Sequence, residues 1–312
     1  MEWEKKGLIF SEELADKYNI CNPQVPYAYR IGDRIRIFFG ARKTGESSAG
    51  IYSIDIDPIN PTRILNVYKE PLLTRGAFGA FDQDGVLPVC VKKVGDDLFM
   101  YYGGFSKQIA GSHTCMMGLA VSKNNGESFN RIYDGPVLPI SKTDPYLIGS
   151  ADIMEYKGLY HMIYTSGTKW SHIESLPEIS YTLKHAISKN GIDWTPTNEA
   201  VLVEETAYDA YAKPSIFRNN DFFVMYFSKR QIINYRKRGH SAYSLGYATS
   251  VDLINWERND GQSGIEVSKQ GWDSEMICYP NIIELENKYL MFYNGNGFGK
   301  SGFGYAEFKK EK

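Results

Sequence analysis

The feature that most limits the fold of this chain is an aromatic, strand-like run that recurs five times at nearly constant spacing. The runs read IRIFFG (35–40), LFMYYGG (98–104), YHMIYTSG (160–167), FFVMYFS (222–228) and YLMFYNG (289–295). When they are aligned on their central aromatic residues, successive copies lie 63, 62, 62 and 67 residues apart. Short segments rich in aromatic and β-branched residues are typical of β-strands. The chain is therefore predicted to consist of five copies of one β unit.

Each copy carries the other elements of a four-stranded antiparallel unit. A lead-in segment such as CYPNII (278–283) precedes each aromatic run and forms a predicted β-hairpin with it. Segments such as LGYATSVDLINW (245–256) supply a third strand, a polar turn and the start of a fourth strand. Four antiparallel strands in each of five repeats predict an all-β, five-bladed β-propeller, with residues 1–312 as a single domain.

The fifth copy ends after its third strand, and the start of the chain offers the missing strand. The segment GFGYAEF (302–308) is followed only by a short tail, whereas WEK at 3–5 resembles WER at 256–258, where the fourth strand of the fourth copy begins. We therefore expect residues 2–10 to complete the fifth blade and to close the ring, which leaves no exposed sheet edge.

Charge and composition narrow the classes of partner. Lys and Arg total 35 against 37 Asp and Glu, so no basic excess exists to bind nucleic acid. The start, MEWEKKGLIF, has no apolar run of signal-peptide length, and no stretch reaches the roughly 18 apolar residues of a membrane-spanning helix. We expect a cytoplasmic protein without nucleic-acid or membrane partners, and the sequence indicates no oligomeric state.

Cysteines and histidines do not predict a metal site. The four cysteines lack CxxC spacing and are expected to be reduced thiols rather than a disulfide framework or zinc ligands. The five histidines lack HExxH or clustered spacing and are interpreted as packed or surface residues.

Carboxylates gather in the loops that lead into the first strand of each copy, which in a propeller open on one face around a central funnel. Two loops carry acids at i, i+2 spacing, and an extended segment would put both acids on one side. Asp84 is the candidate general acid and Glu275 its partner as base or nucleophile. Asp82 and Asp273 would orient or tune that pair, and Asp209 is the reserve carboxylate. The alternative for each acid is a turn or capping residue.

Further polar and aromatic residues around the predicted funnel are candidates for substrate binding. They are Asn22, Arg42, Trp170, Lys213, Arg230 and Tyr279. Acids and aromatic rings together suit a sugar, whose hydroxyl groups pair with polar groups while its C–H face stacks on rings. Arg230 and Lys213 would bind an anionic part of the substrate, or else serve as counter-ions of the funnel acids. The expected partner is a small-molecule sugar or glycan.

The repeats and the motif SVDLINW (250–256), of the form SxDxxxW, resemble the five-bladed propeller glycosidase superfamily. That superfamily includes arabinanases, xylosidases, invertases, levansucrases and mannoside phosphorylases. The likeness covers nearly the whole chain as repeats, and the arrangement looks most like a bacterial branch of glycosidase-like proteins beside cell-surface polysaccharide genes. It implies an enzyme that cleaves or transfers a glycosyl group on a surface-glycan building block. The resemblance to arabinanases extends to a central Ca²⁺, but the sequence shows no ligand set and predicts no cofactor.

Residues at the superfamily's catalytic places differ between its branches. The hydrolase branch has carboxylates where this chain has Asn22, Ser150 and Lys213, so the resemblance does not supply the usual two-carboxylate mechanism there. The phosphorylase branch resembles this chain in Asn22-Pro23, and its proton donor maps to Asp84, although GV at 85–86 replaces the Pro-Arg that follows that donor. The alternatives are therefore a glycoside phosphorylase-like enzyme and a non-catalytic sugar-binding propeller.

Overall fold

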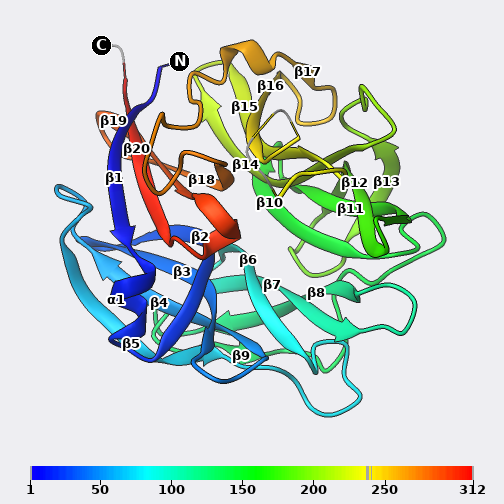
Figure 1. Ribbon diagram of the computed structural model, residues 1–312, viewed down its shortest axis with the longest axis horizontal. Helices are drawn as coiled ribbons and strands as arrows, with labels where there is room; N and C mark the ends of the chain where they lie inside the picture. Colours follow the sequence, from blue (N-terminus) through cyan, green and yellow to red (C-terminus); the bar gives the residue numbers. More distant parts are fainter. Residues whose placement is uncertain (1, 237–238, 240, 311–312) are drawn as a thin grey trace.

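The computed structural model describes residues 2–236, 239 and 241–310, and these form an all-β structure of antiparallel sheets (Figure 1). Three sheets have four strands and one has eight. The short helical segments are α1 (Glu12–Asp16) and the 3-10 turns η1 (Asp260–Gln262) and η2 (Asn296–Gly299). This confirms the predicted all-β class and the four-stranded antiparallel units. No helix among these residues is long and apolar enough to cross a membrane.

The strand order of the four-stranded sheets follows the chain, except for the N-terminal strand. One sheet holds β10 (Ile148–Tyr156), β11 (Leu159–Ile173), β12 (Leu176–Ser188) and β13 (Thr195–Ala200). The next holds β14 (Asp209–Asn219), β15 (Phe222–Gln231), β16 (Ser244–Ser250) and β17 (Glu257–Arg258). The third holds β18 (Cys278–Glu284), β19 (Lys288–Asn294), β20 (Phe303–Lys309) and β1 (Glu4–Phe10). The aromatic runs at 160–167 and 222–228 lie in β11 and β15, and the run at 289–295 lies in β19 except for its last residue. Each of these strands pairs with the first strand of its copy.

The eight-stranded sheet consists of two halves that are joined at one point. One half holds β2 (Ile20–Ile31), β3 (Arg34–Lys43), β4 (Ala49–Ile56) and β5 (Ile64–Leu73). The other holds β6 (Gly85–Val94), β7 (Asp97–Lys107), β8 (His113–Ser122) and β9 (Asn130–Arg131). The link between the halves is a single parallel pair between Ala49 and Gly85. Apart from this pair, each half has the antiparallel hairpin pattern of the other sheets.

The N-terminal strand pairs with the last strand of the chain, as the sequence predicts. β1 runs antiparallel to β20, with Glu4 opposite Glu307 and Phe10 opposite Phe303, and Figure 1 shows the two strands side by side. Trp3, just before β1, is buried, and its Nε1 donates a hydrogen bond to Tyr226 Oη at 2.9 Å. The first strand after the N-terminus thus covers an edge that β20 would otherwise expose.

The first strand of each copy contacts the first strands of the neighbouring copies. These contacts join β2 to β6, β6 to β10, β10 to β14, β14 to β18 and β18 to β2. In three of them, a side chain at the same place in successive copies accepts the backbone N–H of the next first strand. Asp152 Oδ2 accepts from Ile216 N at 2.7 Å, Ser215 Oγ from Ile282 N at 2.8 Å, and Asn281 Oδ1 from Ala28 N at 2.7 Å. Buried N–H groups at sheet edges are satisfied in this way.

Asn281→Ala tests this tie between sheets. The substitution leaves the N–H of Ala28 buried without its acceptor, and an unsatisfied buried donor costs about 1–3 kcal/mol. We expect the free energy of unfolding, measured by urea titration, to fall by that amount. Asn287→Ala, at an exposed position in the following turn, is the matched control and should change stability by less than about 0.5 kcal/mol. Equal stability of the two variants would contradict the role given to Asn281.

Removal of residues 2–10 tests the N-terminal strand. The truncated chain loses the buried Trp3 and exposes the edge of β20, so we expect it to fail to accumulate as soluble, cooperatively folding protein. Soluble yield and size-exclusion chromatography measure this, with Glu4→Ala at an exposed position of β1 as the control. A soluble, monodisperse truncation that unfolds cooperatively would refute the requirement for β1.

Candidate functional site

A cavity of about 160 Å³, here called the central cavity, lies where the five first strands meet. Each of these strands lines it: β2 with Gln24 and Val25, β6 with Leu87, Pro88 and Val89, β10 with Gly149 and Ser150, β14 with Ala212 and Lys213, and β18 with Tyr279. Neighbouring elements complete the wall with Gly103, Phe105, His113, Cys115, Leu147, Thr165, Tyr181 and Tyr243. None of these lining residues is an Asp or a Glu. The central cavity is therefore a tyrosine-rich space that offers nitrogen bases and hydroxyl groups but no carboxylate.

The backbone around the central cavity is irregular in a repeated way. Each first strand has a register shift near the cavity, for example between Ala212 and Ser215 in β14 and between Cys278 and Asn281 in β18. Val25, Lys213 and Tyr279 have φ of 55°, 50° and 58°, which is costly for residues other than glycine. Bulges bend a strand and redirect its side chains. Here they turn side chains of the first strands toward the cavity.

Among the residues that the structure describes, Lys213 is the only lysine that lines the central cavity, and it is 1% exposed. Its backbone N–H is held by Ser150 Oγ at 2.8 Å and by Thr165 Oγ1 at 3.3 Å. Its Nζ lies 5.0 Å from the centre of the Tyr27 ring and has no hydrogen-bond partner among the described residues. Burial lowers the pKa of Lys213 to about 8, although the carboxylate of Asp152 opposes this shift.

Asp152 is fully engaged by groups of the surrounding strands. Its carboxylate pairs with Lys92 Nζ at 3.1 Å and accepts hydrogen bonds from Tyr27 Oη at 3.3 Å and from the backbone N–H groups of Ile153 and Ile216. The carboxylate is buried, and it does not line the central cavity. Asp152 therefore serves as a structural acceptor and as the counter-ion of Lys92.

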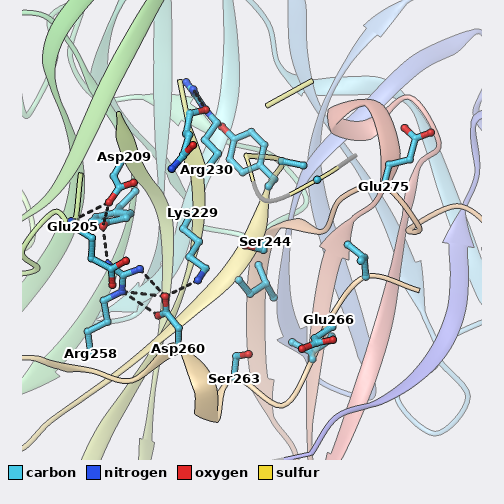
Figure 2. A pocket seen from close by; sticks show the side chains of 18 residues that line it. Glu205, Asp209, Lys229, Arg230, Ser244, Arg258, Asp260, Ser263, Glu266 and Glu275 are labelled. Atoms are coloured by element: carbon cyan, nitrogen blue, oxygen red, sulfur yellow. Dashed lines mark hydrogen bonds and ion pairs between the residues drawn. The ribbon is translucent and has the colours of Figure 1, made fainter. Parts of the chain in front are cut away.

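A second and larger cavity of about 560 Å³, here called the lateral cavity, adjoins the sheet of β14–β17 (Figure 2). It is lined by Glu205, Asp209, Tyr211, Lys229, Arg230, Gln231, Gly239, Ala242, Tyr243, Ser244, Leu245, Arg258, Asp260, Ser263, Ile265, Glu266, Val267 and Glu275. Figure 2 shows Lys229, Arg258 and Asp260 joined by ion pairs on one wall, with Glu275 on the opposite wall. Tyr243 lines both cavities, so they adjoin at this side chain.

Arg230 lies at the inner end of the lateral cavity among three tyrosine rings. Its guanidinium carbon is 3.9 Å from the ring centre of Tyr235, 5.3 Å from that of Tyr181 and 5.6 Å from that of Tyr243. It donates to Tyr243 Oη at 3.0 Å and to two backbone carbonyl oxygens at 3.2 Å. These bonds use three of the five N–H groups of a guanidinium. No carboxylate of the described part of the chain pairs with this side chain, which is 5% exposed.

Two predicted acids, Asp209 and Glu275, line the lateral cavity and differ in environment. The Asp209 carboxylate accepts hydrogen bonds from Tyr211 Oη at 2.8 Å, Thr206 Oγ1 at 2.9 Å and two backbone N–H groups. Burial alone would raise its pKa, but these hydrogen bonds hold the pKa of Asp209 below its ordinary value, so it stays ionised. The Glu275 carboxylate is exposed and has no ion pair or hydrogen bond among the described side chains.

The other predicted acids lie elsewhere. Asp84 is partly buried, accepts the backbone N–H of Lys107 at 2.8 Å and lines neither cavity. Asp82 is buried and pairs with Arg131 at 2.7 Å, and Asp273 is buried and pairs with Lys5 at 2.7 Å. The expectation of an extended i, i+2 segment is wrong, because both segments are turns. One acid of each pair therefore faces inward to its ion-pair partner, while the other is more exposed.

The remaining candidates for substrate binding divide between the cavity wall and its surroundings. Tyr279 lines the central cavity, whereas Asn22 and Arg42 are partly exposed and line neither cavity. Trp170 packs against His113, with ring centres 6.0 Å apart. The roles predicted for these residues stay predictions.

His113 is a wall residue that the sequence analysis did not single out. It lines the central cavity, and its Nδ1 lies 2.7 Å from Ser112 Oγ. Burial lowers the pKa of His113, so the imidazole is neutral near pH 7. The histidine pair His161 and His185 is buried and packed ring against ring, as interpreted from the sequence. Only the arrangement of the sheets, and no local motif, distinguishes His113 from these two.

The part of the chain that the structure describes contains neither a metal-binding cluster nor a disulfide. No group of three or more His, Cys, Asp and Glu side chains is arranged to hold a metal ion there. The four cysteines are free. The described residues in the wall of the central cavity include no carboxylate and so do not fit the central Ca²⁺ that the resemblance to arabinanases implies.

The chain was compared with known proteins by sequence and by fold. No known protein-family profile matches the chain. It is 25% identical over 169 residues to the 1,2-beta-oligomannan phosphorylase of Thermoanaerobacter sp., which covers 52% of each protein. A solved glycoside hydrolase structure superposes with a TM-score of 0.75 over 99% of this chain and 92% of that one, at 18% identity.

The match that decides the family runs over almost the whole chain. Over 309 residues, the chain is 30% identical to the uncharacterized protein Rv1502 of Mycobacterium tuberculosis, which covers 98% of this chain and 99% of that protein. The chain therefore belongs to the family of Rv1502, and its fold is of the propeller-like type found in glycoside hydrolases.

Proposed function

We propose that the protein is a carbohydrate-active enzyme that cleaves or transfers a glycosyl group. We further propose that an anionic group binds beside Arg230, either as part of the sugar substrate or as a second reactant. The shared fold with a glycoside hydrolase and the partial similarity to 1,2-beta-oligomannan phosphorylase support the reaction class. The observation that supports an anionic group is the buried guanidinium of Arg230, which lines the lateral cavity and has no carboxylate partner among the described residues.

The architecture that supports this function is proposed to be one domain of five blades closed into a ring by β1. The two halves of the eight-stranded sheet would be two of these blades, since one residue pair joins them. The pairing of β1 with β20 and the contact between β18 and β2 support the closure. In this arrangement the central cavity is the funnel predicted from the sequence. A cytoplasmic enzyme that acts on a surface-glycan building block is part of the same proposal.

Arg230 has the donors that an oxyanion requires. Its charge has no carboxylate partner among the described residues, and a planar guanidinium matches the oxygen spacing of a carboxylate or phosphate. The three tyrosine rings hold the guanidinium in place, which reduces the ordering cost of binding. Tyr243 and Tyr279 lead from this cation into the central cavity, where their rings can stack on a sugar face.

Phosphorolysis is the form of the reaction that the central cavity favours. Hydrolysis needs a general base to take a proton from water, and no carboxylate of the described residues lines this cavity. A phosphate dianion is already an oxygen nucleophile and needs no such base. It would also supply the negative charge that Arg230 lacks among the described residues. A hydrolytic reaction would instead have to draw its base from the lateral cavity, where Glu275 is the exposed carboxylate that the sequence predicts for that role.

A sugar-binding propeller without catalysis is the second candidate. The absence of a carboxylate from the described wall of the central cavity also favours this function, because tyrosines and cations can bind a glycan without breaking it. Calorimetry with oligosaccharides, nucleotide sugars and sugar phosphates, followed by product analysis on the same mixtures, separates the two. Binding without released sugar or sugar phosphate across the panel would favour the binding protein and would count against the enzyme.

Arg230→Ala tests the anionic group. Charge-assisted hydrogen bonds contribute about 1.5–3 kcal/mol, so the dissociation constant of a phosphorylated or carboxylated sugar should rise about 10- to 100-fold. The neutral sugar should lose less than about threefold, since it does not use the charge. Arg236→Ala, which removes a half-exposed cation paired with Glu178, is the matched control. Equal effects on the charged and neutral sugars would leave Arg230 as a structural cation, and thermal unfolding of each variant checks its folding.

Glu275→Gln separates hydrolysis from phosphorolysis. If Glu275 is the base for water, the hydrolytic rate should fall by at least about 10²-fold, while transfer to phosphate should be retained. Glu266→Gln, which changes another exposed carboxylate of the lateral cavity, is the control. A hydrolytic rate equal to that of the parent would remove Glu275 from the mechanism. Loss of both reactions to the same extent would place Glu275 in substrate binding instead.

A further inference from the structure

We infer that Lys213 is the proton donor to the departing oxygen when the glycosidic bond breaks, an inference that rests on the proposed function. Three observations on Lys213 carry it: its place in the wall of the central cavity, its unpartnered Nζ, and the two hydrogen bonds that fix its backbone. No other residue that lines either cavity combines these features among the described residues.

The buried ammonium of Lys213 is costly to the folded protein. Removing an ammonium from water without giving it a hydrogen bond raises the free energy of the folded protein. The Tyr27 ring at 5.0 Å and the charge of Asp152 offset only part of this cost. The backbone of Lys213 adds strain, since its φ is 50°. Strain and unpaired polar groups persist in folded proteins chiefly where they serve a function. A structural lysine would be expected to resemble Lys184, which is buried but pairs with Asp144 at 3.1 Å.

The charges around Lys213 suit proton donation near neutral pH. Asp152, Lys92, Cys90 and Tyr27 are the titratable groups that face it, and the Asp152 carboxylate is already paired with Lys92. Burial lowers the pKa of Lys213 to about 8. A donor is most efficient when its pKa lies close to the working pH, and an ordinary lysine with a pKa of about 10.4 is too weak an acid for this task.

The step balances with phosphate as the acceptor. The bond between the anomeric carbon and the leaving oxygen breaks, and its electron pair stays on that oxygen. The oxygen takes a proton from Nζ of Lys213, which becomes a neutral amine. A phosphate oxygen forms the new bond to the anomeric carbon, which gives a sugar phosphate. Lys213 then regains a proton from solvent before the next cycle.

The other candidate donors are less well suited. Asp209 is held ionised by its hydrogen bonds and so carries no proton at neutral pH. His113 lines the same cavity, but its imidazole is neutral near pH 7 because burial lowers its pKa. Asp84, the donor predicted from the sequence, lines neither cavity and accepts a backbone hydrogen bond from Lys107. Asp84 is therefore the rival that the experiment must exclude.

The first measurement needs no substrate. Cyanate carbamylates neutral amines, so the rate of labelling at Lys213, followed by peptide mass spectrometry across about pH 6 to 11, reports its titration. We expect a midpoint near pH 8, against about pH 10.4 for a short lysine peptide added to the same samples as the reference amine. Equal midpoints would overturn the inference. Complete absence of labelling at Lys213 would overturn it too, because a donor closed to solvent could not regain its proton.

The second measurement compares Lys213→Met with Lys184→Met. Loss of the unpartnered amine should raise the Tm by about 3 °C, while loss of a paired lysine should lower it by at least as much. On aryl glycosides with phosphate, Lys213→Met should slow poor leaving groups by at least about 10²-fold and largely spare dinitrophenol, which departs without a proton. Lys184→Met should keep the parent rates on all leaving groups.

The outcomes separate the inference from the proposed function. A parent protein that turns over no glycoside, with phosphate or with water, would contradict the proposed function and the role of Lys213 with it. Turnover by the parent together with parent rates in Lys213→Met would overturn the role of Lys213 alone. A loss that depends on the leaving group in Asp84→Asn, but not in Lys213→Met, would assign the proton to Asp84.

Discussion

The structure depends on the hydrogen bonds by which a side chain in one first strand accepts the backbone N–H of the next. Asp152, Ser215 and Asn281 do this in successive sheets. Without them, the backbone N–H groups of Ile216, Ile282 and Ala28 would be buried without an acceptor, and each would cost free energy comparable to a lost hydrogen bond. The bonds also fix the distance between neighbouring first strands. At these three of the five contacts between first strands, the wall of the central cavity is therefore held in register.

The fold was largely predictable from the sequence, and the site was predictable only in part. Aromatic strands repeat at an even spacing because each copy must fill the same volume between its neighbours, so the five runs at 35–295 indicated the four-stranded units. The orientation of Asp82 and Asp273 could not be foreseen in this way. Their ion-pair partners, Arg131 and Lys5, come from distant segments, and the turns that hold the acids break the alternation of an extended strand.

The two buried cations near the cavities are tolerated for different physical reasons. Arg230 cannot lose its proton, so it keeps its charge and is stabilised by the faces of three tyrosines and by oxygen acceptors. Lys213 can lose its proton, and burial shifts its pKa to about 8. The sequence predicted both as substrate-binding residues but could not separate their environments. The difference comes from neighbours such as Tyr235 and Tyr27, which lie on other strands or loops.

The irregular backbone at the central cavity connects stability with function. Val25, Lys213 and Tyr279 lie in bulged first strands and have φ between 50° and 58°. Each such residue costs roughly 1–3 kcal/mol, which the remainder of the strand must offset through its pairing and its buried side chains. Regular strands would pair more completely, but they would point alternate side chains away from the centre. The bulges therefore lower local stability but direct side chains into one small cavity. Regular pairing resumes at Asp152, Ser215 and Asn281, just beyond the bulges, where each side chain also holds the next first strand.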